Sequence, residues 1–342
     1  MCMVLVCAML SFSASALALE GSGTEASPYL VGTLSELNTA LGKGGYIQLT
    51  NDVELTSKLT FYTDKSDFFV LDGQNHQLIR AASYTKYDHL IHIRPQTLTN
   101  NQSSVTIKNL TIDCVKKGKS VNIYGVGNIT LDNVTIQNAT SAFSSLTVNG
   151  SVVNAIDLKI INGSMDAIDV DRGSDLFLEP SISISGESEI YGNIKTKKAV
   201  NAKVYLTSGV YSKEPAKEYI VEGYEAVRNA EGLYEIVPIT YNVKFEMGGA
   251  AAMKDQTVGY GKGAVLPENM KRAGYVFGGW YLDKDFTKPY NGEVLESDIT
   301  LYALWTKIPS LPSTGDRSAL GMWTMMAALS ACAWVVLRKC DA

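Results

Sequence analysis

Acidic side chains are concentrated in one short segment, SMDAIDVDRGSD at residues 164–175, and these are the side chains best suited to chemistry. The candidate residues are Asp166, Asp169, Asp171, Arg172 and Asp175. In a strand, Asp169 and Asp171 would share one face, with their Cα atoms about 6–7 Å apart. Carboxylates at this separation are compatible with glycoside hydrolysis by a carboxylate pair or with a bound Ca²⁺ ion.

The same aspartates could instead only solvate the outer face of a strand, with Ile168 and Val170 pointing inward. We expect this simpler role, because the sequence shows no lyase-type cluster of arginines or lysines. We therefore assign no catalytic residue, and Asp166, Asp169 and Asp171 remain the best candidates. We expect no cofactor, Ca²⁺ being the one ion that these carboxylates could hold.

Histidine and cysteine do not form a zinc-binding pattern. None of the three histidines lies beside a cysteine cluster. His89 and His92, separated by two residues, fall in TKYDHLIHIRP, which we expect to be a loop outside the regular structure. Of the five cysteines, only Cys114 lies outside the two terminal segments, so an exported form would have no internal disulfide.

A motif with a different chemical meaning lies near the C-terminus. It consists of Leu311, Pro312, Ser313, Thr314 and Gly315. An apolar stretch at 319–337 follows, about 28 Å long as a helix, and the basic pair Arg338 and Lys339 comes directly after it. This order resembles the sorting signal of sortase substrates on Gram-positive cell walls. Alternatively, the tail could be an ordinary membrane anchor, with the motif a coincidence.

The resemblance implies a covalent link to the cell wall. A sortase cysteine would attack the Thr314 carbonyl, Gly315 would leave, and an amine of peptidoglycan would take over the threonyl group. Arg338 and Lys339 would stay cytoplasmic as a stop-transfer signal while the apolar helix lies in the membrane.

The N-terminal segment has the pattern of a secretion signal. Residues 1–19 form an apolar run that ends in small residues, with Ala14-Ser15-Ala16 or Ala16-Leu17-Ala18 as the cleavage pattern. The basic region that normally precedes such a run is missing, so we expect this signal to be truncated. The mature protein would then be secreted and held on the cell wall.

The central part contains an internal repeat with a period of about 24 residues. VTIKNLTID, ITLDNVTIQ and VNAIDLKII begin at Val105, Ile129 and Val153, and further steps of the same length from Leu158 reach Ile182 and then Leu206. In each unit the apolar alternation changes phase at a bend, where residue types that tolerate the left-handed conformation occur. The bend residues are Asn109, Asn133 and Asp157, and stacked asparagines could bond to each other along the coil.

These repeats resemble a right-handed parallel β-helix of the pectate-lyase-like superfamily. A leucine-rich repeat has a similar period, but these units lack its leucine frame and helical face. Before the repeats, Thr33 and Glu36 form a capping box for a short helix that would cover the open end of the coil.

The segment from Ile239 onward has another pattern, with YNVKFEMGG, GYVFGGWYLD and SDITLYALWTK as landmarks. It resembles one Listeria-Bacteroides repeat, of the internalin B-repeat type, which implies a small β-grasp-like fold. The family usually has Asn where Met247 stands, so the first turn could differ. Trp280 and Trp305 could form a sugar-stacking platform, but in so small a domain we expect them to form the core.

The expected chain is thus all-β, with five parts. They are a signal peptide at 1–19, a parallel β-helix at 20–238, a Listeria-Bacteroides repeat at 239–306, a linker at 307–310 and a sorting signal at 311–342. With 30 basic and 35 acidic residues scattered along the chain, no basic stripe for nucleic acid exists.

We expect a noncatalytic adhesin or structural ectodomain that contacts a polysaccharide or a host-surface ligand, with a sortase and peptidoglycan as its partners in anchoring. The alternatives are a wall-anchored lyase or glycoside hydrolase, and a spacer without a ligand.

Overall fold

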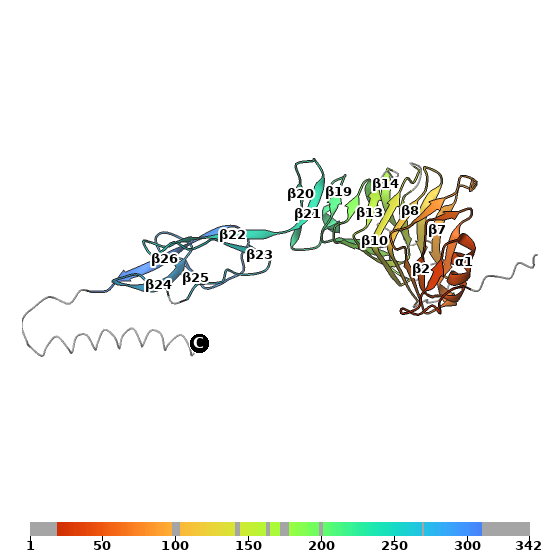
Figure 1. The fold of residues 1–342 in the computed structure, drawn as a ribbon. Coiled ribbons are helices and arrows are strands. Elements are labelled where there is room, and N and C mark those ends of the chain that lie inside the picture. The colour runs from red at the N-terminus through yellow and green to blue at the C-terminus, as the bar shows by residue number, and fades with distance from the viewer. Residues whose placement is uncertain are drawn as a thin grey trace, which may run out of the picture. The chain divides into compact units, whose positions relative to one another are not determined.

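The computed structural model describes residues 19–97, 103–140, 144–161, 165–171, 178–197, 201–268 and 270–309. The chain divides into two compact units: the first comprises the residues up to Tyr241 together with Val258–Lys262, and the second comprises Asn242–Thr257 and the residues from Gly263 onward. Figure 1 shows that both are built mainly from β-strands. The all-β prediction is therefore confirmed, and the first unit has a parallel β-helix-like fold.

The first unit consists of two sheets whose strands alternate along the chain. The larger sheet has 15 strands. Its main path is β1 (Tyr29–Val31), β2 (Gly45–Leu49), β5 (Phe68–Asp72), β8 (Ser104–Asp113), β10 (Asn128–Gln137), β13 (Lys159–Ile161), β16 (Glu189–Ile190), β19 (Val210–Tyr211), β21 (Tyr234–Pro238) and β20 (Tyr224–Arg228). Off this path lie β3 (Val53–Leu55), β6 (Gln77–Arg80), β12 (Val152–Ile156), β15 (Ser181–Ser185) and β18 (Lys203–Leu206).

The second sheet of this unit has six strands, all paired in parallel. In spatial order they are β17 (Asn193–Thr196), β14 (Asp166–Asp171), β11 (Leu146–Asn149), β9 (Lys119–Tyr124), β7 (His89–Arg94) and β4 (Leu59–Tyr62). Apolar residues from both sheets point inward and form one continuous core. Short 3₁₀ turns occur at η1 (Thr63–Lys65) and η3 (Lys217–Tyr219).

The repeat period holds where the sequence shows it most clearly. Val105 pairs with Ile129, and Ile129 pairs with Val153, so each partner lies one repeat further along the chain. The next coil is longer, because Ile182, which the repeat placed after Leu158, instead pairs with Val153. The prediction of an unbroken period is therefore wrong there, since a longer connection enters that coil without disturbing the inward-facing positions.

The bends contain the residues that the repeat suggested. Asn109, Asn133 and Asp157 have φ angles of +50°, +52° and +52°. The Asn133 side chain donates from Nδ2 to Asn109 Oδ1 at 3.0 Å, and Asn109 donates to Asp72 Oδ1 at 3.1 Å. Each bond links successive coils, so the bends are held along the coil axis.

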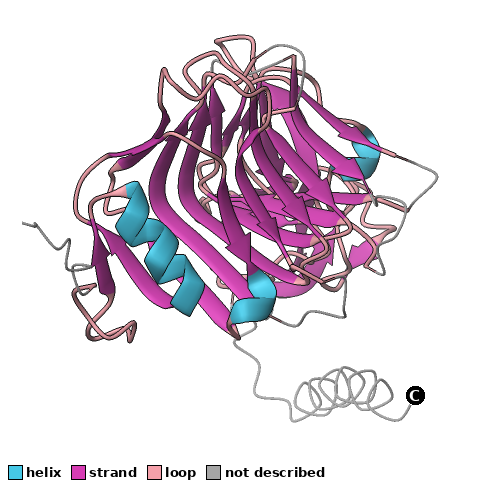
Figure 2. Ribbon diagram, turned by 90° about the vertical axis from the view of Figure 1, so that its right-hand side faces the viewer, coloured by secondary structure: helices cyan, strands magenta, loops and turns pink. Residues whose placement is uncertain are grey.

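Both ends of the coil are covered. Helix α1 (Leu34–Lys43) begins at Thr33 with a complete capping box and buries Leu37, Ala40 and Leu41. It lies over the first coil, against β1 to β4 (Figure 2). At the other end, β21 pairs antiparallel with β19 and β20 pairs antiparallel with β21. The helix covers the apolar end of the core, and β21 pairs with backbone groups of β19 that an open coil would expose.

The second unit is a five-stranded sheet. Its spatial order is β23 (Gln256–Gly259), β22 (Thr240–Glu246), β26 (Ile299–Lys307), β24 (Tyr275–Tyr281) and β25 (Pro289–Tyr290). β22 and β26 are parallel, whereas β24 is antiparallel to β26. The core of this sheet includes Phe245, Trp280 and Leu301.

Candidate functional site

The acidic segment forms strand β14 in the six-stranded sheet. Ile168 and Val170 are fully buried, so the alternation of a strand places Asp169 and Asp171 on the outer face. Asp166 is partly exposed at the start of the strand. Arg172 and Asp175, the other two candidates, lie outside the described residues.

Two lysines, one in the neighbouring strand β17 and one directly after it, bind two of the three aspartates. Lys195 Nζ lies 2.5 Å from Asp166 Oδ2, and Lys197 forms an ion pair with Asp171. Burial alone would raise the pKa of Asp166, but the hydrogen bonds from Lys195 and Asn193 outweigh it and hold the pKa below its ordinary value. This carboxylate therefore stays ionised in neutral solution.

Asp169 has the opposite environment. Its partial burial, together with the negative charge of Asp171, raises the pKa of its carboxyl group. Two carboxyl groups with pKa values displaced in different directions could in principle act as an acid and a base. The positive charges of Lys197 and of Lys195, which stands opposite Asp169 in the strand register, lower the pKa of Asp169 in part and so reduce this difference.

A row of polar residues continues from Asp169 across the sheet. Asp169 pairs with Thr147, Thr147 with Asn122, and Asn122 with His92. Asn122 is 7% exposed; its Nδ2 lies 2.9 Å from His92 Nε2, and its Oδ1 accepts a bond from Asn149. This row is ordered by side-chain hydrogen bonds at the end nearest His92.

The histidine pair is part of this sheet, so the prediction of a loop at His89 and His92 is wrong. Both lie in β7, where the consecutive buried residues Leu90 and Ile91 interrupt the alternation and bring the two rings to the same side. Their ring centroids are 6.0 Å apart. Burial is the main cause that lowers the pKa of each imidazole to about 4, so both are neutral at pH 7.

The geometry offers little for a metal ion. Across the described ranges, no group of three or more His, Cys, Asp or Glu residues is arranged to hold one. Asp166 and Asp171, which we considered as Ca²⁺ ligands, instead bind Lys195 and Lys197. Cys114 is buried, and burial raises the pKa of its thiol to about 11.

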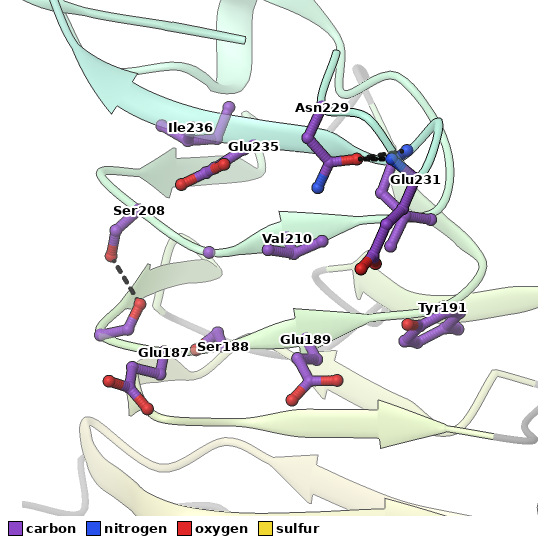
Figure 3. A pocket seen from close by; sticks show the side chains of 13 residues that line it. Glu187, Ser188, Glu189, Tyr191, Ser208, Val210, Asn229, Glu231, Glu235 and Ile236 are labelled. Atoms are coloured by element: carbon purple, nitrogen blue, oxygen red, sulfur yellow. Dashed lines mark hydrogen bonds between the residues drawn. The ribbon is translucent and has the colours of Figure 1, made fainter. Parts of the chain in front are cut away.

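A groove of about 380 Å³ lies near the C-terminal end of the coil, and no sequence pattern indicated it. Figure 3 shows Glu187, Glu189, Glu231 and Glu235 along its walls, with Tyr191 at one side. The Glu189 carboxylate is 2.5 Å from Lys159 Nζ. These residues come from separate segments at 186–191, 208–210 and 229–236, so only the strand register brings them together.

The aromatic residues of the second unit pack against each other. Trp280 is 3% exposed and lies 5.0 Å from Phe245 and 5.4 Å from Phe277, centroid to centroid. Trp305 packs on Phe277 at 5.3 Å and donates from Nε1 to the carbonyl of Met247 at 2.8 Å. Trp280 therefore belongs to the core, whereas Phe277 and Trp305 are partly exposed and pack beside it.

Residues 241–304 match the family model of the Listeria-Bacteroides repeat domain. The second unit is thus a Listeria-Bacteroides repeat domain, in a region that the sequence had placed at 239–306. Met247, which stands where the family usually has Asn, is 6% exposed and precedes Gly248 and Gly249, both with positive φ. No curated protein matches the chain.

The two terminal segments for which we predicted signals lie almost entirely outside the described residues. These include residues 1–18 of the secretion signal, the motif Leu311 to Gly315, and the basic pair Arg338 and Lys339. In the part of the chain that the structure describes, no helix has the length and apolar character needed to cross a membrane.

Proposed function

We propose that this chain is exported, is attached to the cell wall by a sortase, and presents its β-helix as a noncatalytic ligand-binding ectodomain. The observation that carries the proposal is the order of the C-terminal segments. The motif at 311–315, the apolar stretch at 319–337 and the pair Arg338 and Lys339 follow each other directly. This order suits a substrate that is stalled in the membrane with its motif outside.

The attachment reaction has two steps. A thiolate of the sortase attacks the carbonyl carbon of Thr314, and the bond to Gly315 breaks, so that the tail leaves as a free amine. An amino group of peptidoglycan then attacks the thioester, the thiolate leaves, and a new amide joins Thr314 to the wall. Pro312 favours an extended conformation at the residue before it, which suits binding in a groove.

Two features support a binding role for the ectodomain. The lysine ion pairs of Asp166 and Asp171 give these carboxylates a structural role within the sheet. The coil also offers a long regular surface. Many copies on one wall would bind a shared ligand with high avidity, even if each contact is weak.

Substitution at the scissile residue tests the anchoring. Thr314→Ala should move the protein from the covalent wall fraction to the membrane and medium, measured by immunoblotting after wall digestion. Ser313→Ala, at the variable position of the motif, is the matched control and should leave attachment unchanged. Thr314→Ala protein that still resists extraction with hot detergent would disprove the anchoring proposal.

A wall-anchored carbohydrate-active enzyme is the second candidate, and Asp169 is the observation that favours it, because its pKa is raised beside the charged Asp171. The full chain would be incubated with polysaccharides and new reducing or unsaturated ends would be measured. Products that disappear with Asp169→Asn but not with Asp132→Asn, an outer-face aspartate of the larger sheet, would establish the enzyme. We expect no products from any of these proteins.

A further inference from the structure

One row on the outer face of the larger sheet carries no charge over seven successive strands. The row runs from Tyr46 on β2 to Tyr205 on β18, and its members are paired in register. Between the two tyrosines lie Val70, Thr106, Thr130, Asn154 and Ser183. We call it the neutral row.

The neutral row faces away from the core. On β10, Ile129 and Leu131 are 2% and 1% exposed, so Thr130 between them points outward. Asn154 is exposed, and Tyr205 is 44% exposed. The row two residues earlier in each strand is also mostly uncharged, with Ser104, Asn128 and Ser181 among its members.

The surroundings make this neutrality a distinctive feature. On the other side, the row containing Asp72, Lys108 and Asp132 is charged. The outer face of the six-stranded sheet carries charges as well, among them Arg94 and Asp169. In a chain with 19% charged residues, the charges therefore lie beside the neutral row and not within it.

Hydroxyl and amide groups in the neutral row repeat at the spacing of the strands, about 4.8 Å. Such groups can both donate and accept hydrogen bonds, and the free-energy cost of removing them from water is smaller than for charged groups. Aromatic rings stand at both ends, where Tyr46 packs edge-on to Phe68 at 5.3 Å and Tyr205 is exposed. Rings of this kind can stack on the apolar faces of sugars.

Other partners fit this surface less well. A nucleic acid or an acidic polymer needs basic side chains, and the neutral row has none. A protein interface is usually centred on large apolar or arginine anchors, whereas Thr106, Thr130 and Asn154 occupy the centre of this row.

We propose that the neutral row binds an uncharged polysaccharide, laid along the coil axis across the strands. The inference rests on the proposed ligand-binding role of the ectodomain and names both its face and its ligand class.

The test introduces charge without changing the core. The full chain, expressed in a host without sortase and extracted with detergent, would be mixed with insoluble cellulose, chitin and α-glucan, and its binding measured by co-sedimentation. The double variant Thr130→Lys and Asn154→Lys should bind about tenfold more weakly, because two ammonium groups would lose water without a partner. The matched control, Thr111→Lys and Thr135→Lys, adds the same charge to the paired strands β8 and β10 of the same sheet, beyond the bend, and should bind within about twofold of the unchanged chain. Tyr205→Ala, at an exposed position, should weaken binding several-fold and serves if the lysine variant unfolds.

Each outcome decides the proposal. Loss of binding in the neutral-row variants alone would support it. Equal binding by the neutral-row and control variants would overturn it while leaving a glycan-binding ectodomain intact, and so would a preference for acidic alginate. Self-association that is lost with the neutral-row variants would assign the face to a second copy of the chain instead. Failure to bind any polysaccharide, neutral or acidic, would reject both this inference and a glycan-binding role, while wall attachment, scored separately with Thr314→Ala, would be unaffected.

Discussion

The buried arginine at position 80 makes a stringent test of how the irregular part of the β-helix is held. Arg80 is 2% exposed and donates to three backbone carbonyls. They belong to Lys86 at 3.2 Å, Asp88 at 2.8 Å and Lys119 at 3.1 Å. Its guanidinium also lies 4.4 Å from the ring of Tyr84. These contacts join the segment after β6 to strands β7 and β9.

The expected cost of Arg80→Ala follows from these contacts. A hydrogen bond from a charged donor contributes about 1.5–3 kcal/mol, so three of them would give about 6 kcal/mol if nothing else changed. The substitution also removes the cost of burying the guanidinium, and water can reach some of the freed carbonyls, so the net loss should be about 3 kcal/mol. Arg80→Lys should lose less, because it keeps a charged donor but not the planar fork.

The chain allows this loss to be assigned to one unit. All four tryptophans occur at position 280 or later, so tryptophan fluorescence does not report on the β-helix. In urea, Arg80→Ala should shift the circular dichroism transition of the strands and leave the fluorescence transition of the Listeria-Bacteroides repeat domain unchanged. Arg94→Ala, at a partly exposed arginine, is the control and should lose about 1 kcal/mol or less. A loss below about 1 kcal/mol for Arg80→Ala would refute the reasoning that these three bonds hold the segment.

Two further predictions concern the bends and the histidine pair. Asn133→Ala should destabilise the β-helix by about 1–2 kcal/mol, because it removes the hydrogen bond to Asn109 and keeps a β-carbon at a positive φ. Asn133→Gly should destabilise it less, since glycine adopts a positive φ without strain. A larger loss of stability for the glycine variant in urea unfolding would contradict this. His89 and His92 have a pKa of about 4 in the folded chain, below the value of 6.5 expected in the unfolded chain. Between these pH values the unfolded chain therefore binds more protons than the folded one. The free energy of unfolding should thus fall as the pH is lowered from about 6.5 toward 4. Because both rings are partly exposed, the fall should be about 1 kcal/mol for each, and His92→Gln should make the dependence flatter; an unchanged slope would show that the histidines do not cause it.

Local patterns were enough to predict much of this protein. The alternation of apolar residues identified the strands around Ile107 and Leu131. The change of phase at Asn109 and Asn133 identified the bends, because a left-handed residue between two strands shifts the alternation within one short segment. The capping box at Thr33 and Glu36 is equally local, and it is complete in the structure.

The candidate site was only partly accessible from the sequence. That Ile168 and Val170 point inward follows from alternation alone. That Lys195 and Lys197 bind the aspartates beside them depends on the register of β17, which lies beyond a connection of irregular length. The neutral row also depends on the strand register, since its members come from seven separate strands and no single segment shows that they lie side by side.

The sequence by itself determined the repeating core, the bends, the Listeria-Bacteroides repeat domain and the order of the C-terminal motif, because each depends on residues that are close along the chain. Tertiary structure alone decided that His89 and His92 lie in a strand, that Arg80 is buried, and that the coil between Val153 and Ile182 is longer than the two before it. Pairing between parallel strands depends on which inward-facing residues fill the shared core, and connections of different length can satisfy that requirement equally well. No local sequence pattern therefore specifies the length of a coil or the strands that pair.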